Sequence, residues 1–340
     1  MTVVLLVLDG LGARSMAPDV MPTLTGWAGR GLHRPEGATS VLASSTYPNF
    51  ASIATGTLPE RHGLFANVVL VEGEPRPAAQ VGPDAPGLFD GGSEVVVGDH
   101  NLIGVMAARG ARWHWPSDGV IPDGTDLDMF GYVADGEVVT RVVEALERKP
   151  EFLLAQMNSP DTVAHVFGPD SDEAKETYRA LDAQLAVIGA ALDLSRDLVM
   201  VTSDHDQETV EPERRIDLAS VAAKHGIEVT VVDEGTAAML GGPGGADTAW
   251  LTGIEGVEDW IGLAPSLSLV FSEPRWWFGG PAMPGFRGAH GGRRTRATVA
   301  VAVGAPHLLA AIAPGLGAPV FGAEDWRGLV EIGRTMGRGL

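Results

Sequence analysis

Short runs of apolar residues recur along the chain and predict buried β-strands. Each run is rich in Val and Leu, and helix-like stretches such as 172–192 lie between several of them. The runs lie at 2–8, 152–157, 198–202, 228–232 and 297–303. Strands that are apolar on both faces are typical of a sheet with helices on each side. The pattern therefore predicts an α/β fold with a central, mostly parallel sheet.

Polar residues directly follow three of these predicted strands. The letters LDG come after the first run, NSPD after the second and SDHD after the third. Open α/β sheets bind their ligands outside the carboxyl ends of the strands. We therefore expect a functional site at this edge of the sheet.

Two Gly- and Pro-rich segments, 68–150 and 207–289, interrupt the pattern. We interpret both as cap-like insertions over the strand ends. A chain of 340 residues with 45% hydrophobic content can bury a large core. The prediction is thus a single catalytic domain over residues 1–340, with caps at about 68–150 and 207–289.

Charge and composition restrict the partners of the protein. The chain has 24 basic and 44 acidic residues, for a net charge of −20. Nucleic-acid polymers bind to basic surfaces, so we expect a small molecule as the partner. The first residues, MTVVLLVLDG, contain an apolar stretch too short to span a bilayer and no targeting pattern. We therefore expect a cytoplasmic protein that does not bind membranes.

Six acidic and histidine residues at predicted strand ends or in loops are candidate metal ligands. There is no cysteine, so any metal must be held by His, Asp or Glu. Asp161 and His165 are four residues apart and would share one face of a helix, although a surface pair would have the same spacing. The other four also suit turns, polar loop starts or an exposed glycine loop. The full set is Asp9, Asp161, His165, Asp204, His205 and His290, and as one set it suits two divalent ions better than one.

Three hydroxyl residues, Ser44, Ser45 and Thr46, precede Tyr-Pro-Asn where a helix is predicted to begin. No serine of the chain lies in a GxSxG turn, so a Ser-His-Asp hydrolase is not indicated. A bound metal ion would activate a hydroxyl by lowering its pKa, as it lowers the pKa of bound water from about 15.7 to about 7. Thr46 would also lie at the helix N-terminus, which stabilises an alkoxide and an incoming phosphate.

Five motifs together resemble those of a known enzyme family. In chain order they read VLDG, STYPNFASIATGTLPERHGLFAN, NSPDTVAHVFGP, SDH and GAHGG, and they extend from Asp9 to His290. This series is similar to the type I phosphodiesterase/nucleotide pyrophosphatase family of the alkaline phosphatase superfamily. WPSDG, at residues 115–119, resembles a further block of that family. The resemblance implies an alkaline-phosphatase-like three-layer sandwich with small cap insertions.

The resemblance also implies the metal ligands. Asp161, His165 and His290 match the ligands of one zinc ion. Asp9, Thr46, Asp204 and His205 match those of a second. The expected cofactors are therefore two divalent ions, most simply Zn²⁺, with Mn²⁺, Fe²⁺ and Mg²⁺ as alternatives.

The remaining roles concern the substrate. Thr46 matches the nucleophile, and Asn67 matches an amide that binds a phosphate oxygen. Tyr47 matches an aromatic residue that stacks on a leaving group, and Trp115 is a candidate for the same surface. The block beyond WPSDG reads IPDGTDLDMF, so we expect the second stacking tyrosine of the family to be missing. Asp206 replaces a glycine usual after SDH; it would either alter metal preference or occupy a left-handed turn.

The sequence therefore favours an enzyme, a phosphoric diester hydrolase or nucleotide pyrophosphatase that acts through a covalent threonine intermediate. The alternatives within the superfamily are a phosphonate-bond hydrolase of the phosphonoacetate type and a phosphomonoesterase. An alternative from another functional class is a dinucleotide-binding module, because Gly10 and Gly12 follow the first predicted strand. The exact substrate, the native metal, the oligomeric state and the role of Asp206 stay open.

Overall fold

A seven-stranded sheet forms the centre of the computed structural model, which describes residues 1–283 and 285–316. Its strand order is β2-β19-β9-β1-β8-β6-β7. The strands are β1 (Val3–Leu8), β2 (Leu32–His33), β6 (Ser93–Val97), β7 (Trp113–Trp115), β8 (Phe152–Met157), β9 (Leu198–Thr202) and β19 (Ala300–Gly304). From β9 to β7 all neighbours run parallel, whereas β19 runs antiparallel to β9. The predicted α/β fold with a mostly parallel sheet is confirmed.

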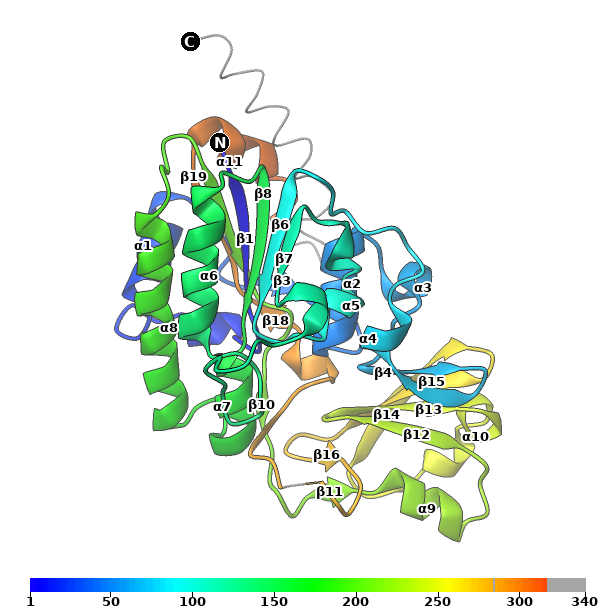
Figure 1. Ribbon diagram of the computed structural model, residues 1–340. Coiled ribbons are helices and arrows are strands. Elements are labelled where there is room, and N and C mark those ends of the chain that lie inside the picture. The colour runs from blue at the N-terminus through cyan, green and yellow to red at the C-terminus, as the bar shows by residue number, and fades with distance from the viewer. Residues whose placement is uncertain (284, 317–340) are drawn as a thin grey trace.

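Alternate residues of β1 point into two separate cores, which makes the molecule a three-layer sandwich (Figure 1). Val3, Leu5 and Val7 pack with α2 (Thr46–Thr55), α5 (Leu102–Val105) and α11 (Pro306–Ile312). Val4 and Leu6 pack on the other face, where α1 (Pro22–Arg30), α6 (Asp135–Glu147) and α8 (Asp172–Ala190) lie. Because successive strand residues face opposite sides, a strand apolar throughout needs both layers.

A second, four-stranded antiparallel sheet lies beside the main body, at the lower right of Figure 1. Its order is β12-β13-β15-β14. The strands are β12 (Thr230–Glu234), β13 (Ala237–Gly241), β14 (Val257–Ala264) and β15 (Leu267–Ser272), accompanied by α9 (Leu218–Lys224) and α10 (Pro243–Ala246). One face of this sheet packs on Ala43 and Ala66, close to the start of α2. The run predicted at 228–232 therefore falls in this small sheet and not in the central one.

The predicted cap at 68–150 is wrong for much of its length. This segment supplies β6 and β7 to the central sheet and α6 to a helical layer. Its beginning, the hairpin of β4 (Val68–Val71) and β5 (Glu74–Pro77) followed by α4 (Ala78–Val81), lies outside the central sheet. The strands β6 and β7 are short and lie among many glycines and prolines. Their apolar residues therefore do not form runs long enough to be recognised as strands from the sequence.

Further short helices and strand pairs lie between these elements. They are α3 (Pro59–His62), α7 (Ser159–Phe167), β3 (Ala38–Thr39) with β18 (Ala297–Thr298), β10 (Glu208–Thr209) with β17 (Gly288–Ala289), and β11 (Arg215–Ile216) with β16 (Trp277–Phe278). Within residues 1–283 and 285–316, no helix has the length and apolar character needed to cross a membrane.

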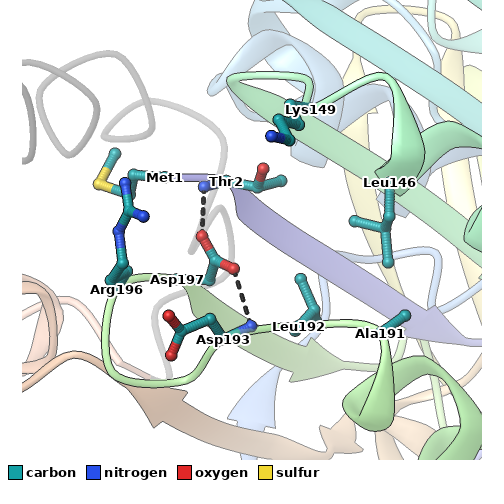
Figure 2. A pocket seen from close by; sticks show the side chains of 9 residues that line it. All are labelled: Met1, Thr2, Leu146, Lys149, Ala191, Leu192, Asp193, Arg196 and Asp197. Carbon is teal, nitrogen blue, oxygen red and sulfur yellow. Dashed lines mark hydrogen bonds between the residues drawn. The ribbon is translucent and has the colours of Figure 1, made fainter.

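A cavity of about 240 Å³ lies where the parallel strands begin (Figure 2). Asp197, just before β9, accepts hydrogen bonds from the backbone N–H groups of Thr2 and Asp193. The carboxylate thereby joins the starts of β1 and β9. This cavity is at the opposite end of the strands from the candidate ligands, so it is not the predicted site.

Candidate active site

The candidate ligands meet because their strands are neighbours. Asp9 follows β1, Asp161 lies on α7 just after β8, and Asp204 and His205 follow β9. These three strands are adjacent and parallel in the order β9-β1-β8, so their carboxyl ends open at one edge. His290 comes from the loop after β17.

Two overlapping groups of side chains have the spacing of metal ligands. In the first, Asp161 Oδ1 lies 3.3 Å from His165 Nε2 and 3.7 Å from His290 Nε2. In the second, His205 Nε2 lies 3.5 Å from Asp9 Oδ1 and 3.9 Å from Asp161 Oδ1. Asp161 thus stands between the two groups. The structure brings all six predicted protein ligands together, since Asp204 Oδ2 is also 3.4 Å from His205 Nε2.

The histidine rings are oriented for metal binding. Each directs Nδ1 at a backbone carbonyl oxygen: His165 at Gly288 (2.9 Å), His205 at Asp206 (3.1 Å) and His290 at Ser44 (3.2 Å). A carbonyl only accepts hydrogen bonds, so Nδ1 carries a proton and Nε2 is the nitrogen available to bind a metal. All three Nε2 atoms therefore face the carboxylates as potential ligands.

The carboxylates of this cluster differ in their pKa values. Burial acts against the charge of Asp161, but the neighbouring His165 lowers the Asp161 pKa below its usual value. Burial raises the pKa of Asp9 well above its usual value, and the neighbouring charges of Asp204 and Asp161 raise it further. Burial also raises the pKa of Asp204. Asp9 Oδ1 and Asp204 Oδ2 are buried without a hydrogen-bond partner. Buried carboxylates of this kind are stable when they are paired or bind metal, so the residues fit divalent cations.

Of the three consecutive hydroxyl residues, Thr46 is the one whose side chain reaches this cluster. It is the first residue of α2, and its Oγ1 lies 3.2 Å from His205 Nε2. The Ser44 hydroxyl instead donates to the Thr295 carbonyl oxygen at 2.7 Å. Neither Ser44 nor Ser45 lines the pocket described next, whereas Thr46 does.

A pocket of about 360 Å³ adjoins the ligand cluster. Asn67 lines the pocket. The Asn67 side-chain Oδ1 accepts the Tyr47 backbone N–H at 2.9 Å, so the NH₂ group is the part of the amide that remains to donate to another group. Aromatic side chains line the pocket beside the ligands: Tyr47, Phe130, Tyr132 and Phe286. The arrangement is suited to a phosphoryl group at Thr46 with an organic substituent among the aromatic rings.

Two predictions about these aromatic residues need correction. Trp115 does not line the pocket; it is buried in the core, where the Arg141 guanidinium lies 5.4 Å above its ring. Tyr132 lies two residues beyond the block IPDGTDLDMF, and it does line the pocket. Asp128 fixes the loop, because its carboxylate accepts the backbone N–H groups of Phe130 and Tyr132 and the Thr162 hydroxyl of α7.

Asp99 and Asn101 are pocket residues that sequence reasoning missed. The Asp99 carboxylate is 2% exposed and accepts hydrogen bonds from the backbone and side-chain nitrogens of Asn101. Burial, then the Asp99 charge, raises the pKa of Tyr47, so this phenol stays neutral. No Lys or Arg is among the described residues that line the pocket. Both residues follow β6, in the segment 68–150 for which the sequence predicts a cap.

Comparison with known proteins decides the family. A family model described as type I phosphodiesterase / nucleotide pyrophosphatase matches residues 3–255. The chain belongs to this family. An uncharacterized pyrophosphatase/phosphodiesterase of Schizosaccharomyces pombe is 30% identical over 200 residues, which are 53% of this chain and 39% of the yeast protein. Ectonucleotide pyrophosphatase/phosphodiesterase family member 1 of Rattus norvegicus is 27% identical over 49% of this chain and 20% of the rat protein.

The chain spans well under half the length of these curated relatives. Solved structures match over more of it. Phosphonoacetate hydrolase from Sinorhizobium meliloti, in complex with phosphonoformate, has a TM-score of 0.70 at 21% identity over 89% of both chains. Murine ectonucleotide pyrophosphatase / phosphodiesterase 5 has a TM-score of 0.69 at 16% identity over 90% of this chain and 88% of that one. These likenesses confirm the alkaline-phosphatase-like fold.

In this member of the type I phosphodiesterase / nucleotide pyrophosphatase family, Asp206 pairs with an arginine. Its Oδ2 lies 3.1 Å from Arg14 Nε, and its Oδ1 accepts the Gln207 backbone N–H at 2.7 Å. The carboxylate fills the space that a Cβ at Gly12 would need. It therefore points away from the ligands, and Asp206 is not among the residues with positive φ.

Gln207, next to Asp206, supports the ligand cluster. Its Nε2 donates to Asp161 Oδ1 at 2.6 Å and to the Asp161 carbonyl oxygen at 3.0 Å. An amide that donates to a ligating carboxylate fixes the direction of its lone pairs. Nothing in the local sequence distinguishes this glutamine from an ordinary loop residue.

Proposed function

We propose that the protein hydrolyses phosphodiester or pyrophosphate bonds of nucleotide-type substrates, with Thr46 as the nucleophile and two divalent ions, Zn²⁺ by preference, as cofactors. Membership of the type I phosphodiesterase / nucleotide pyrophosphatase family supports this class of reaction. The observation that carries the proposal is the position of Thr46, whose Oγ1 lies 3.2 Å from His205 Nε2 and lines the aromatic pocket.

The protein's own groups would divide the work as follows. The Thr46 hydroxyl gives up its proton to solvent, and Oγ1 attacks phosphorus to form an O–P bond. The bond to the leaving oxygen breaks, and that oxygen takes the bonding electron pair and a proton from solvent where its pKa requires one. The N-terminus of α2 and the Asn67 amide stabilise the negative charge that grows on the phosphoryl oxygens. Water then cleaves the threonine–phosphoryl bond and regenerates the hydroxyl. Divalent ions held by the six Asp and His side chains would supply the positive charge that lowers the hydroxyl pKa and neutralises the phosphoryl group.

The charge of the pocket favours a diester over the two alternatives. Phosphonoacetate and a phosphate monoester each bring additional negative charge. Here, among the described lining residues, Asp99 is an acid outside the candidate ligands, and no Lys or Arg balances it. A phosphodiester directs a neutral organic group, such as a nucleoside, into this space, where Tyr47 and Tyr132 offer rings for stacking.

The expectation of a cytoplasmic protein acting on small molecules is retained as part of the proposal. The net charge of −20 supports the second half, because it repels polyanions. Cell fractionation tests the first half.

The deciding experiment compares kcat/KM in one buffer after zinc reconstitution. We expect bis-p-nitrophenyl phosphate and the p-nitrophenyl ester of thymidine 5′-monophosphate to be cleaved at least tenfold better than p-nitrophenyl phosphate or phosphonoacetate. A preference for phosphonoacetate would overturn the proposal in favour of the phosphonate hydrolase. A preference for p-nitrophenyl phosphate would favour a phosphomonoesterase.

A further inference from the structure

A carboxylate of the second sheet lies directly behind Asn67. Glu234 is the last residue of β12 and is 5% exposed. Its Oε1 accepts the Asn67 backbone N–H at 2.8 Å. The Asn67 side-chain Oδ1 accepts the Tyr47 backbone N–H at 2.9 Å. Asn67 is therefore held at its backbone by the second sheet and at its side chain by the first turn of α2.

This orientation has a chemical consequence for the amide. With Oδ1 engaged by α2, the Asn67 NH₂ group is the end left to donate, and Asn67 and Thr46 both line the pocket. An oxyanion donor is effective only when it is held where the charge develops. The Glu234 contact supplies one of the two fixed points that hold it.

The burial of Glu234 is costly for a purely structural residue. No Lys or Arg forms an ion pair with it among the described residues. Burial raises the pKa of Glu234 to about 7, and the Ser45 hydroxyl and the backbone N–H groups of Asn67 and Val68 offset this only in part. An apolar residue would avoid this cost, but it would offer no acceptor to the Asn67 backbone N–H.

The turn that joins β12 to β13, directly after Glu234, also holds the loop of a candidate metal ligand. The Thr236 backbone N–H donates to the His290 carbonyl oxygen at 2.6 Å, and Thr236 Oγ1 accepts the Gly292 backbone N–H at 3.0 Å. Gly291 has φ +107°, and a Cβ there would collide with the Glu234 carbonyl oxygen. The segment 234–236 thus contacts both Asn67 and the His290 loop.

We propose that Glu234 is a positioning residue, which acts from the second sheet through the Asn67 backbone to aim the Asn67 amide at a phosphoryl oxygen on Thr46. This inference rests on the proposed function. The four-stranded sheet then sets the geometry of the active site, in addition to covering it.

The test is a double-mutant cycle on the zinc-reconstituted protein with bis-p-nitrophenyl phosphate. Glu234→Met keeps the length of the side chain and removes the acceptor, and we expect kcat to fall about 10- to 100-fold with KM within about threefold. Glu234→Gln keeps an Oε1 acceptor and should retain kcat within about threefold. Asp233→Asn, on the opposite face of the same strand, is the matched control and should leave kcat unchanged.

The cycle separates positioning from general support of the fold. In an Asn67→Ala background, Glu234→Met should cause no further loss of kcat, because the group it positions is gone. An equal loss in both backgrounds, or an unchanged kcat in Glu234→Met alone, would overturn the proposal. Zinc content and the thermal midpoint are measured for each variant. If the double variant does not fold, the comparison of kcat between Glu234→Gln and Glu234→Met decides whether the acceptor at residue 234 positions Asn67.

Thr46→Ala, run in parallel, separates this inference from the proposed function. Full activity of Thr46→Ala would contradict the nucleophile assignment and, with it, the geometry that Glu234 is proposed to serve. Loss of activity in Thr46→Ala together with an unchanged Glu234→Met would leave the proposed function standing and reject only the role of Glu234.

Discussion

The Thr46 hydroxyl oxygen lies 3.2 Å from His205 Nε2, although 159 residues separate the two along the chain. Thr46 begins α2, and His205 follows the end of β9. The contact places the hydroxyl at the edge of the group of acids and histidines and at the positive end of a helix. The first prediction follows from this position.

Thr46→Ala should lower kcat by at least about 10³-fold, because it removes the attacking oxygen, while the zinc content should fall little since the six Asp and His side chains remain. Thr46→Ser should keep a measurable fraction of the activity. Steady-state kinetics and elemental analysis give both quantities. Ser44→Ala is the control, because its hydroxyl is engaged by the Thr295 carbonyl oxygen; it should cost about 1 kcal/mol of stability and little kcat. A loss of kcat in Ser44→Ala as large as that in Thr46→Ala would assign the nucleophile differently.

The purified protein should carry about two divalent ions per chain, and chelation should abolish activity and lower the thermal midpoint by several degrees. Without cations, Asp9, Asp161 and Asp204 are buried close together, and burial raises the pKa values of Asp9 and Asp204. A ligand bound only by the folded state stabilises that state. His165→Ala should reduce the content to about one ion, because His165 belongs to only one of the two groups. A protein that keeps full activity after chelation and contains no metal would contradict this prediction.

Tyr132→Ala should raise KM for substrates with a nucleoside or aryl substituent about tenfold, with a smaller effect on kcat. Stacking on one aromatic ring contributes about 1–3 kcal/mol per base, and Tyr132 lines the pocket. Tyr132→Phe retains the ring and should behave like the parent protein. KM values for the p-nitrophenyl ester of thymidine 5′-monophosphate check this. Equal KM values for the parent protein and Tyr132→Ala would place the substituent elsewhere.

Asp206→Asn should leave the relative affinities for Zn²⁺ and Mn²⁺ unchanged within about threefold, because the carboxylate faces Arg14 and not the ligands. It should lower the free energy of unfolding by about 1–2 kcal/mol, since a buried partner of an ion pair is altered. Arg14→Gln should show a similar loss of stability, and metal titration with chemical denaturation measures both effects. A reversed preference between Zn²⁺ and Mn²⁺ in Asp206→Asn would show that the residue does act on the metals.

Acid should destabilise the protein through His62. Burial lowers the pKa of His62 from 6.5 to about 4. Its Nδ1 accepts the Leu64 backbone N–H, so Nε2 carries the proton and donates to the Ser52 hydroxyl. Because the folded pKa lies below the unfolded one, this contribution to stability is complete above pH 6.5 and is lost as the pH falls toward 4.

The measurement is the difference in unfolding free energy between the parent protein and His62→Gln, taken by chemical denaturation from pH 7.5 to 4.5. The advantage of the parent protein should shrink as the pH falls. His225→Gln changes an exposed histidine at the end of α9 and should show no such trend. A difference for His62→Gln that stays constant with pH would contradict a neutral buried imidazole.

The strands that carry the ligands were predictable from the sequence alone. The runs at 152–157 and 198–202 coincide with β8 and β9, and the polar letters after them mark the edge where the site forms. Both results rest on local information, because a strand buried on both faces must be apolar along its length. The family was also predictable from local information, because each of its ordered motifs is a short stretch of contiguous residues.

The tertiary structure decided which side chains face one another. Trp115 and Tyr132 are both aromatic residues near a family block, yet packing under Arg141 buries one, while the loop held by Asp128 brings the other to the pocket. Glu234 lies 167 residues from Asn67, with which it forms a hydrogen bond. Such contacts depend on how separate elements pack, and the energy that selects them comes from burial and hydrogen bonding between distant segments, which no local pattern of residues records.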